Sequence, residues 1–137
     1  QGESASLFLN DSGMFRDRHL KFRVAEESQR VLGFGTQAFD YDNDGLRDLV
    51  VTNGHIDDAA DNEGTFKQPA QLFANLRTHF EVIPVDDPSG YWGQSHLGRS
   101  LATLDFDANG SLDFVVTHVE EPSALLLNQT QSKHHWL

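Results

Sequence analysis

Short apolar segments rich in β-branched residues alternate with polar turns along the chain. Four of these segments flank acidic turns, namely Thr36–Asp40, Asp48–Thr52, Leu101–Asp105 and Asp113–Thr117. They are short and rich in valine, threonine and phenylalanine, so we expect strands rather than helices. No segment keeps an apolar period of 3.6 residues, and Ala25–Leu32 is expected to form one helical turn at most.

The remaining apolar segments predict further strands. Third strands are expected at Leu7–Asn10, Leu72–Asn75 and Leu125–Asn128, and fourth strands at Lys21–Val24 and Phe80–Pro84. Many short strands at regular spacing favour an all-β fold of antiparallel sheets, such as β-propeller blades or a related β-array. The pattern predicts about two four-stranded blades, which is an incomplete propeller.

The sequence repeats itself at an offset of 65 residues. Asp40–Asp48 aligns with Asp105–Asp113 without a gap, and Leu7–Asn10 aligns in the same way with Leu72–Asn75. We therefore interpret residues 1–137 as one repeat region, with a first repeat at 7–71 and a second at 72–137. The first repeat is longer within Gly54–Ala70, which is polar and acidic and is expected to be a surface loop.

The first acidic turn carries side-chain oxygens at positions 1, 3, 5 and 9 and a glycine at position 6. Calcium takes six to eight oxygen ligands, and a tightly wound loop supplies them from alternate side chains and one backbone carbonyl. Glycine at position 6 permits the sharp turn, often at positive φ. The predicted calcium ligands are Asp40, Asp42, Asp44, the carbonyl of Leu46 and Asp48.

The second acidic turn has the same spacing but one carboxylate fewer. Its predicted ligands are Asp105, Asp107, Asn109, the carbonyl of Ser111 and Asp113. Fewer ligand charges predict weaker calcium binding at the second turn. The sequence thus predicts two Ca²⁺ sites of unequal affinity.

Acidic turns of this kind also have other interpretations. A solvated acidic turn without a metal is the simplest, but two copies in register, each between apolar strands, make it less favoured. An EF-hand requires a glutamate at position 12 and flanking helices, whereas Val51 and Val116 occupy that position. Magnesium is disfavoured because it prefers a small octahedral site that keeps water.

The two turns, the Gly33–Gly35 segment, the Asp48–Gly54 run and the Leu-Phe-X-Asn strands resemble the FG-GAP/VCBS repeats of integrin-α-like β-propellers. This resemblance implies that each acidic loop joins the first two strands of a blade and that its aspartates bind calcium. The second repeat departs from the pattern, with Arg99-Ser100 in place of Phe34-Gly35.

A narrower resemblance is to repeats found beside ASPIC/UnbV domains. It rests on the Asn53–Ile56 segment and on Lys133–Leu137, which looks like the opening of such a domain. Both resemblances imply an extracellular, secreted or cell-surface protein.

The charge balance narrows the class of partner. The chain has 21 acidic and 10 basic residues and a net charge of -11, which argues against nucleic-acid binding. It has no cysteine and no apolar run long enough for a membrane span, so neither disulfides nor membrane insertion is expected.

Other candidate sites are weaker. A further ligand site is conceivable in the loop that contains His55, Asp57, Asp58, Asp61 and Glu63, although a solvated acidic loop is favoured. Tyr91 and Trp92 are interpreted either as an exposed recognition surface or as core.

No catalytic constellation emerges. Ser95 and His96 are adjacent, so on a strand their side chains point to opposite faces. We therefore expect a non-enzyme.

The leading hypothesis is a calcium-binding structural or adhesion module, which binds a protein or glycan partner. Its incomplete propeller is expected to be completed by further copies or by the remainder of a longer chain. Two alternatives stay open: a propeller fragment of a larger secreted carbohydrate-active enzyme, and a self-assembling extracellular fibre or surface-layer protein.

Overall fold

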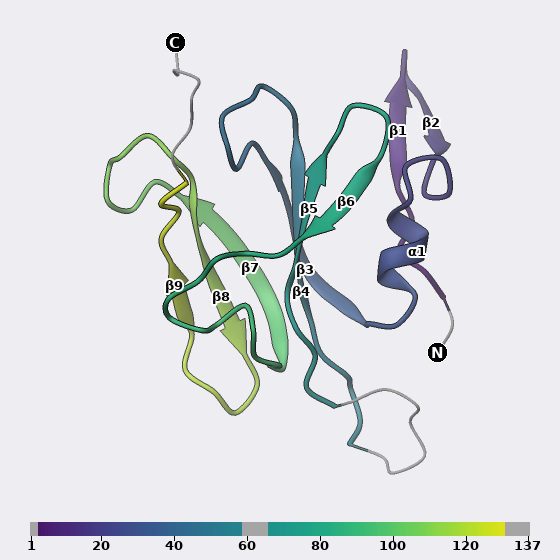
Figure 1. Cartoon of the computed structure of the whole chain (residues 1–137). Coiled ribbons are helices and arrows are strands. Elements are labelled where there is room, and N and C mark those ends of the chain that lie inside the picture. Colours follow the sequence, from purple (N-terminus) through teal and green to yellow (C-terminus); the bar gives the residue numbers. More distant parts are fainter. Residues whose placement is uncertain (1–2, 59–65, 131–137) are drawn as a thin grey trace.

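The computed structural model describes residues 3–58 and 66–130, which form three antiparallel sheets and one short helix (Figure 1). In chain order the elements are β1 (Phe8–Asp11), β2 (Met14–Asp17), α1 (Val24–Ser28), β3 (Gly33–Phe39), β4 (Asp48–Asn53), β5 (Gln71–Asn75), β6 (Phe80–Ile83), β7 (Gly98–Leu104), β8 (Asp113–His118) and β9 (Ala124–Leu126). The expectation of an all-β fold with antiparallel sheets is confirmed.

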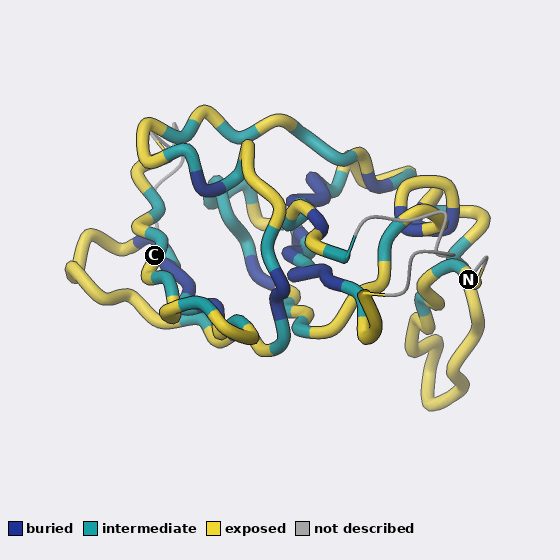
Figure 2. Tube along the Cα trace, turned by 90° about the horizontal axis from the view of Figure 1, so that it is seen from below, coloured by how far each residue is buried: buried dark blue, intermediate teal, exposed yellow. Residues whose placement is uncertain are grey.

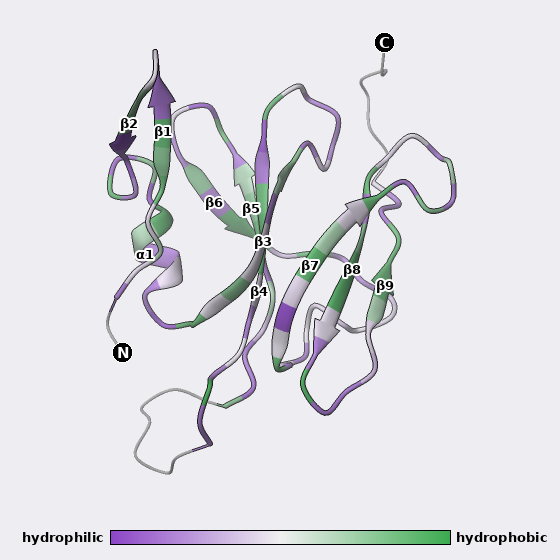
Figure 3. Ribbon diagram, turned by 180° about the vertical axis from the view of Figure 1, so that it is seen from behind, coloured by the Kyte–Doolittle hydropathy of each residue, from purple (hydrophilic) through white to green (hydrophobic). Residues whose placement is uncertain are grey.

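Each sheet is built from strands that follow one another in the chain. The strand orders are β1-β2, β3-β4-β5-β6 and β7-β8-β9, and no sheet closes on itself within the described residues. The β1–β2 and β7–β9 sheets lie on opposite sides of the β3–β6 sheet (Figures 1 and 3). The strands carry much of the apolar sequence, whereas the connecting loops are mainly hydrophilic (Figure 3).

Residues 65 apart take equivalent places in the two larger sheets. Phe39 pairs with Asp48 at the start of the first acidic loop, and Leu104 pairs with Asp113 at the second. Both first strands also contain an irregularity near their beginning, between Gly33 and Gly35 and between residues 98 and 100. Residues 65 apart in the sequence therefore also occupy equivalent positions in the strand pairing.

One predicted strand is wrong. Lys21–Val24 is not extended: Arg23 has a φ of 60°, and α1 begins at Val24. The fourth strand of that unit is β2, whose Phe15 is 65 residues before Phe80, the first residue of β6. Val24 is buried against Phe80, so its apolar character reflects packing of the helix and not strand alternation.

The core has two parts, one on each face of the central β3–β6 sheet. The larger part lies between the two larger sheets and comprises Phe39, Val50, Leu72, Tyr91, Leu101, Phe114 and Val116. The smaller part comprises Val24, Phe73 and Phe80. Adjacent residues on a strand point to opposite faces, which is why Leu72 and Phe73 belong to different parts. Buried residues accordingly gather at the centre, while the N-terminal hairpin is exposed throughout (Figure 2).

Glycines set the distance between the two larger sheets. A Cβ atom on Gly35 would lie 2.7 Å from the backbone nitrogen of Leu101, and one on Gly98 would lie 1.6 Å from Thr52 Oγ1. No side chain fits at either position without moving backbone. Next to this contact the guanidinium of Arg99 lies 4.1 Å from the centre of the Phe34 ring, a cation–π contact between equivalent residues of the two strands.

Two sequence expectations lie partly or wholly beyond the described residues. The structure describes the ends of the expected Gly54–Ala70 loop but not residues 59–65, and the expected domain junction at Lys133–Leu137 lies outside the described residues. Within the described part, no helix is long and apolar enough to cross a membrane.

The glycine contact yields a test of the sheet packing. Gly35→Ala and Gly98→Ala are each expected to lower the free energy of unfolding by about 3 kcal/mol or more, because overpacking forces backbone shifts. Gly93→Ala is the control, since the nearest atom to its added Cβ is 3.8 Å away. Urea unfolding of the three variants measures the effect, and equal losses in all three would contradict the proposed role of the contact.

Candidate metal centres

The two acidic loops occupy matching places in the fold. The first joins β3 to β4 and the second joins β7 to β8, and both lie at the same end of the molecule (Figure 1). Each loop is therefore flanked by strands and not by helices, which agrees with the exclusion of an EF-hand. Their residues reach these places because each loop connects the two strands of an antiparallel pair, directly after Phe39–Asp48 in one sheet and Leu104–Asp113 in the other.

In the first loop three predicted ligands come together. Asp40, Asp42 and Asp48 each offer a carboxylate oxygen, and these oxygens lie within 4.8 Å of one another. The Asp44 carboxylate is not part of this group; its Oδ1 accepts the backbone N–H of Leu46 at 2.8 Å. Coordination by Asp44 and by the Leu46 carbonyl stays a prediction.

The second loop repeats this arrangement. Asp105, Asp107 and Asp113 bring carboxylate oxygens within 4.8 Å of one another. Asn109 takes the place of Asp44, and its Oδ1 accepts the backbone N–H of Ser111 at 2.7 Å. The position-5 side chain thus turns to the backbone in both loops, and coordination by Asn109 and by the Ser111 carbonyl likewise stays a prediction.

Both loops wind through the same two left-handed backbone positions. Position 4 has a φ of 60° at Asn43 and 57° at Ala108, and position 6 has a φ of 86° at Gly45 and 87° at Gly110. Glycine adopts this conformation without strain, and asparagine tolerates it better than other residues do. Ala108 is therefore the one strained residue among these four.

Backbone amides hold the first carboxylate of each loop in place. The two oxygens of Asp40 accept the N–H groups of Asp44 at 3.0 Å and Gly45 at 2.8 Å. Asp105 accepts the corresponding amides of the second loop, both at 3.1 Å. These hydrogen bonds fix the carboxylates close together before any ion binds.

Burial makes the ionised form of the first loop costly. Asp48 is only 2% exposed, and its oxygens accept the amides of Tyr41 at 3.0 Å and Asn75 at 2.8 Å. Burial nevertheless raises the pKa of Asp48 to about 6. Burial and the neighbouring Asp44 charge also raise the pKa of Asp42. A bound cation would offset both effects.

Asn128 hydrogen-bonds to residues of both acidic loops, a link that was not predicted from the sequence. Its backbone N–H donates to Asp113 Oδ1 at 2.7 Å, as that of Asn75 donates to the first loop. Its side-chain Nδ2 donates to the carbonyl of Tyr41 at 2.7 Å, and its own carbonyl accepts Asn109 Nδ2 at 3.2 Å. The only available signal was the position of Asn128 in a strand aligned with Leu72–Asn75.

The carboxylate groups fit a hard divalent cation. Both consist of oxygen donors, which Ca²⁺ prefers, and neither group includes a histidine. The two groups differ in exposure, because Asp40 and Asp42 are half-buried whereas Asp105 and Asp107 are exposed. Because the first group is half-buried, solvent and salt screen its attraction to a cation less. This agrees with the tighter binding expected there.

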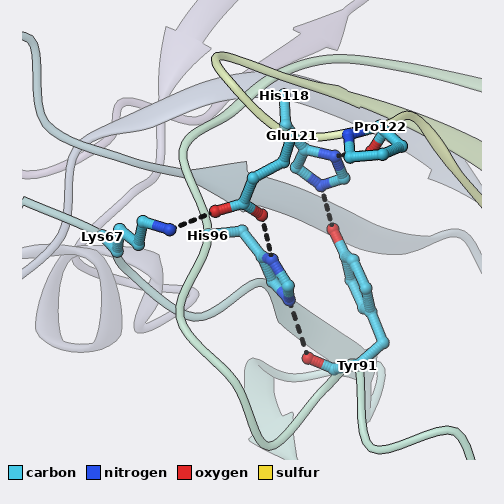
Figure 4. Close-up of polar contacts among 6 residues, drawn as sticks. All are labelled: Lys67, Tyr91, His96, His118, Glu121 and Pro122. Carbon is cyan, nitrogen blue, oxygen red and sulfur yellow. Dashed lines mark hydrogen bonds and ion pairs between the residues drawn. The ribbon is translucent and has the colours of Figure 1, made fainter.

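A second polar cluster lies near the ends of β7 and β8 (Figure 4). His96 and His118 show no metal-ligand spacing along the chain, yet their ring centres are 5.1 Å apart. The Tyr91 hydroxyl donates to His118 Nε2 at 2.9 Å, and His118 Nδ1 donates to the carbonyl of Pro122 at 2.8 Å. Both nitrogens of His118 are engaged, so this ring acts as a structural link between loops.

Glu121 connects the other half of this cluster. It forms ion pairs with Lys67 and, at 2.8 Å, with Nδ1 of His96, whose Nε2 faces the carbonyl of Tyr91 at 3.3 Å (Figure 4). Lys67 first and His96 second lower the pKa of Glu121 to about 2. Burial, and the Glu121 charge after it, raise the pKa of Tyr91 to about 12.

The weaker sequence candidates have separate outcomes. Tyr91 is buried, so the recognition-surface interpretation is wrong for this residue. Trp92 is half-buried and packs edge-on against Phe114, with ring centres 5.6 Å apart. Of the acidic loop around His55, Asp61 and Glu63 lie outside the described residues.

Searches of protein-family models and of curated proteins found no match to this chain.

The strained position 4 of the second loop gives a stability prediction. Ala108→Asn is expected to raise the free energy of unfolding by about 0.5–1 kcal/mol, because asparagine adopts the left-handed conformation at lower cost. Asn43→Ala is the matched change in the first loop and is expected to act in the opposite direction. Urea unfolding without calcium measures both, and a destabilised Ala108→Asn variant would contradict the argument.

Glu121 predicts a pH dependence of stability. Its folded-state pKa lies below the unfolded value of about 4.5, so its ion pairs stabilise the fold above that pH and lose this effect as the pH falls towards 2. Glu121→Gln is expected to cost about 1 kcal/mol at pH 6, since Lys67 is half-exposed and the pair is partly screened.

The comparison requires unfolding curves at pH 6 and pH 3. The deficit of Glu121→Gln relative to the wild type should shrink at pH 3. The exposed neighbour Glu120 supplies the control, because Glu120→Gln should differ from the wild type by the same amount at both pH values. A Glu121→Gln deficit that stays constant would show that the ion pairs do not carry it.

Proposed function

We propose that this chain is a calcium-binding, non-enzymatic structural or adhesion module whose sheets are blades of a β-propeller of the FG-GAP/VCBS type. One observation carries the proposal. Loop positions 1, 3 and 9 bring three carboxylates together twice, at equivalent places in two sheets. A solvated acidic turn does not require its carboxylates to converge, and convergence without a cation is electrostatically unfavourable.

Calcium is the cation that best suits this donor set. Asp40, Asp42 and Asp48 would hold it in the first loop, and Asp105, Asp107 and Asp113 in the second. Bound calcium would supply positive charge that stabilises the ionised carboxylates. Transition metals are disfavoured because they prefer imidazole or thiolate ligands, which these groups lack.

The surroundings of Asp48 explain how ion binding would stabilise the sheet. Asp48 opens β4, pairs with Phe39 at the end of β3 and accepts the amide of Asn75 from β5. Stabilising the ionised Asp48 carboxylate would therefore strengthen the contacts among β3, β4 and β5 at the loop end of the sheet. Binding to the folded state alone raises stability by mass action, by about 2.7 kcal/mol for one site at a calcium concentration of 100 Kd.

The structural part of the proposal has its own support. The polar cluster with two histidines and a tyrosine uses the nitrogens of both rings in internal hydrogen bonds or ion pairs, and the hydroxyl bonded to His118 belongs to the buried Tyr91, which favours a structural cluster. Millimolar calcium outside cells suits oxygen-ligand loops of modest affinity, so we place the protein outside the cell or at its surface.

Calcium titration tests the proposal. Calorimetry on the wild-type chain is expected to give two ions bound per chain, and calcium is expected to raise the melting temperature by several degrees, as about 1–3 kcal/mol of added stability would. Asp42→Asn and Asp107→Asn occupy the same loop position, and each is expected to remove one ion. Asp42→Asn should remove the tighter event, because the first loop carries more charge.

A control and a competing ion sharpen this experiment. Glu81→Gln neutralises an exposed acid on β6, outside both loops, and should leave both binding events unchanged. Magnesium at the same concentration should raise the melting temperature less than calcium does. No calcium-dependent change in the wild-type melting temperature would refute the proposal.

A further inference from the structure

The N-terminal hairpin has the same register as the outer half of the central sheet. Asn10 pairs with Phe15 in β1–β2 just as Asn75 pairs with Phe80 in β5–β6. The turns also match, since Ser12, 65 residues before Arg77, shares its positive φ: 53° and 66°. The β1–β2 hairpin is therefore a structural counterpart of β5–β6.

The two hairpins differ in what covers them. Phe73 is 1% exposed and Phe80 is 6% exposed, because β5 pairs with β4 and both rings belong to the smaller core. Their counterparts Phe8 and Phe15 are 58% and 70% exposed. Among the described residues β1 pairs with β2 alone, so the hairpin lacks the neighbouring strand that β4 provides for β5.

At the opposite end of the molecule the described residues do not include a complementary fourth strand. Up to residue 130 the β7–β8–β9 sheet has no counterpart of β6, and β9 contains three residues. Leu125 and Leu127 on this edge are exposed. A cleft of about 660 Å³ runs beside β9 and is lined by Trp92, Phe114 and Leu126, among others. The third strand of this sheet is thus only partly buried, with Ala124 and Leu126 packed against the larger core.

We infer that the β1–β2 hairpin of a second copy of this chain replaces β9 on β8 and completes a four-stranded sheet. The inference rests on the proposed blade architecture. The β4–β5 pair is its template: Val50 pairs with Leu72, which places Val115 opposite Leu7 of the second copy. In this template the amide of Asn10 from the second copy donates to Asp113, as that of Asn75 donates to Asp48. The second copy thereby contributes to the second acidic loop.

The exchange is favourable for a physical reason. It gives up three β8–β9 residue pairs, the half-exposed side chains of β9 and the hydrogen bond from the Asn128 amide to Asp113, which the Asn10 amide replaces. It gains an equivalent pairing by β1, a fourth strand and burial of Phe8 and Phe15, whose rings are now largely in water. It also covers the open edge of β1, so that β2 is the edge strand of the completed sheet, and fewer free edges lower the risk of uncontrolled association.

The assembly has a defined symmetry. The contact joins the β1–β2 hairpin of one copy to β8 of the next, so two different surfaces meet and the interface is heterologous. Such an interface forms a closed ring when the rotation between neighbouring copies divides a full turn evenly. The described residues of each copy supply one complete sheet and two halves, which together amount to two blades. Propellers have about four to eight blades, so closed rings of two, three or four copies satisfy this limit.

Disulfide trapping tests the exchange, because the chain has no cysteine of its own. The double variant Leu7→Cys/Val115→Cys is expected to form an intermolecular disulfide, seen as dimers and larger species on a non-reducing gel. Light scattering of the wild type is expected to give two to four copies. Leu7→Cys/Thr117→Cys is two residues out of register and should cross-link far less.

A second double variant prevents the exchange within the folded chain. Val115 pairs with Leu125 on β9, so Val115→Cys/Leu125→Cys should form an intramolecular disulfide that holds β9 on β8. This variant is expected to be monomeric when oxidised and to assemble when reduced. A failure to fold is excluded by showing that the oxidised protein unfolds cooperatively.

Several results would overturn the inference. These are a monomeric wild type at high protein concentration, assembly without the Leu7–Val115 cross-link, and assembly of the oxidised Val115–Leu125 variant. Calcium melts on the same proteins keep the two proposals apart. A melting temperature that depends on calcium, without cross-linking, supports the calcium sites and refutes the exchange. Cross-linking without any effect of calcium supports the exchange and refutes the calcium sites.

Discussion

The close backbone contact between β3–β4 and β7 is the constraint on which the rest of the structure depends. At Gly35 and Gly98 the two sheets approach so closely that one methyl group would meet backbone atoms or Thr52. This approach brings Phe39 and Phe114 together in one core, with ring centres 6.0 Å apart. Because both sheets pack in this fixed relation and share one register, their acidic loops emerge at the same end of the molecule.

The acidic loops show how the fold bears a concentration of negative charge. Backbone amides of each loop, and one amide at or just after the neighbouring third strand, donate to the carboxylates and replace part of their lost hydration. The compensation is incomplete at Asp48, whose burial raises its pKa to about 6. A bound calcium ion would offset the remaining electrostatic cost. The same carboxylates would therefore determine both ion binding and the stability of the fold.

Local pattern predicted most strands and both loops, but it failed where packing decides the conformation. The segment Lys21–Val24 looks like a strand, yet Val24 opens a helix that packs on Phe80. The fourth strand at Met14–Asp17 is exposed and shows no apolar alternation, and only its alignment with Phe80–Ile83 marked it. The cluster of His96, His118 and Glu121 was equally hidden, since it forms where separate loops meet and has no spacing rule.

The sequence by itself determined the acidic loops, their glycine turns and the 65-residue register. These features depend on residues within a few positions of one another or on direct repetition, so they are readable without long-range contacts. Tertiary structure alone decided which oxygens converge, how Asn128 joins the two loops, and which apolar strands remain uncovered. Those outcomes depend on how separate strands pack. Phe8 and Phe73 illustrate this, because they are equivalent in sequence but only Phe73 has strands on both sides and a core to bury it.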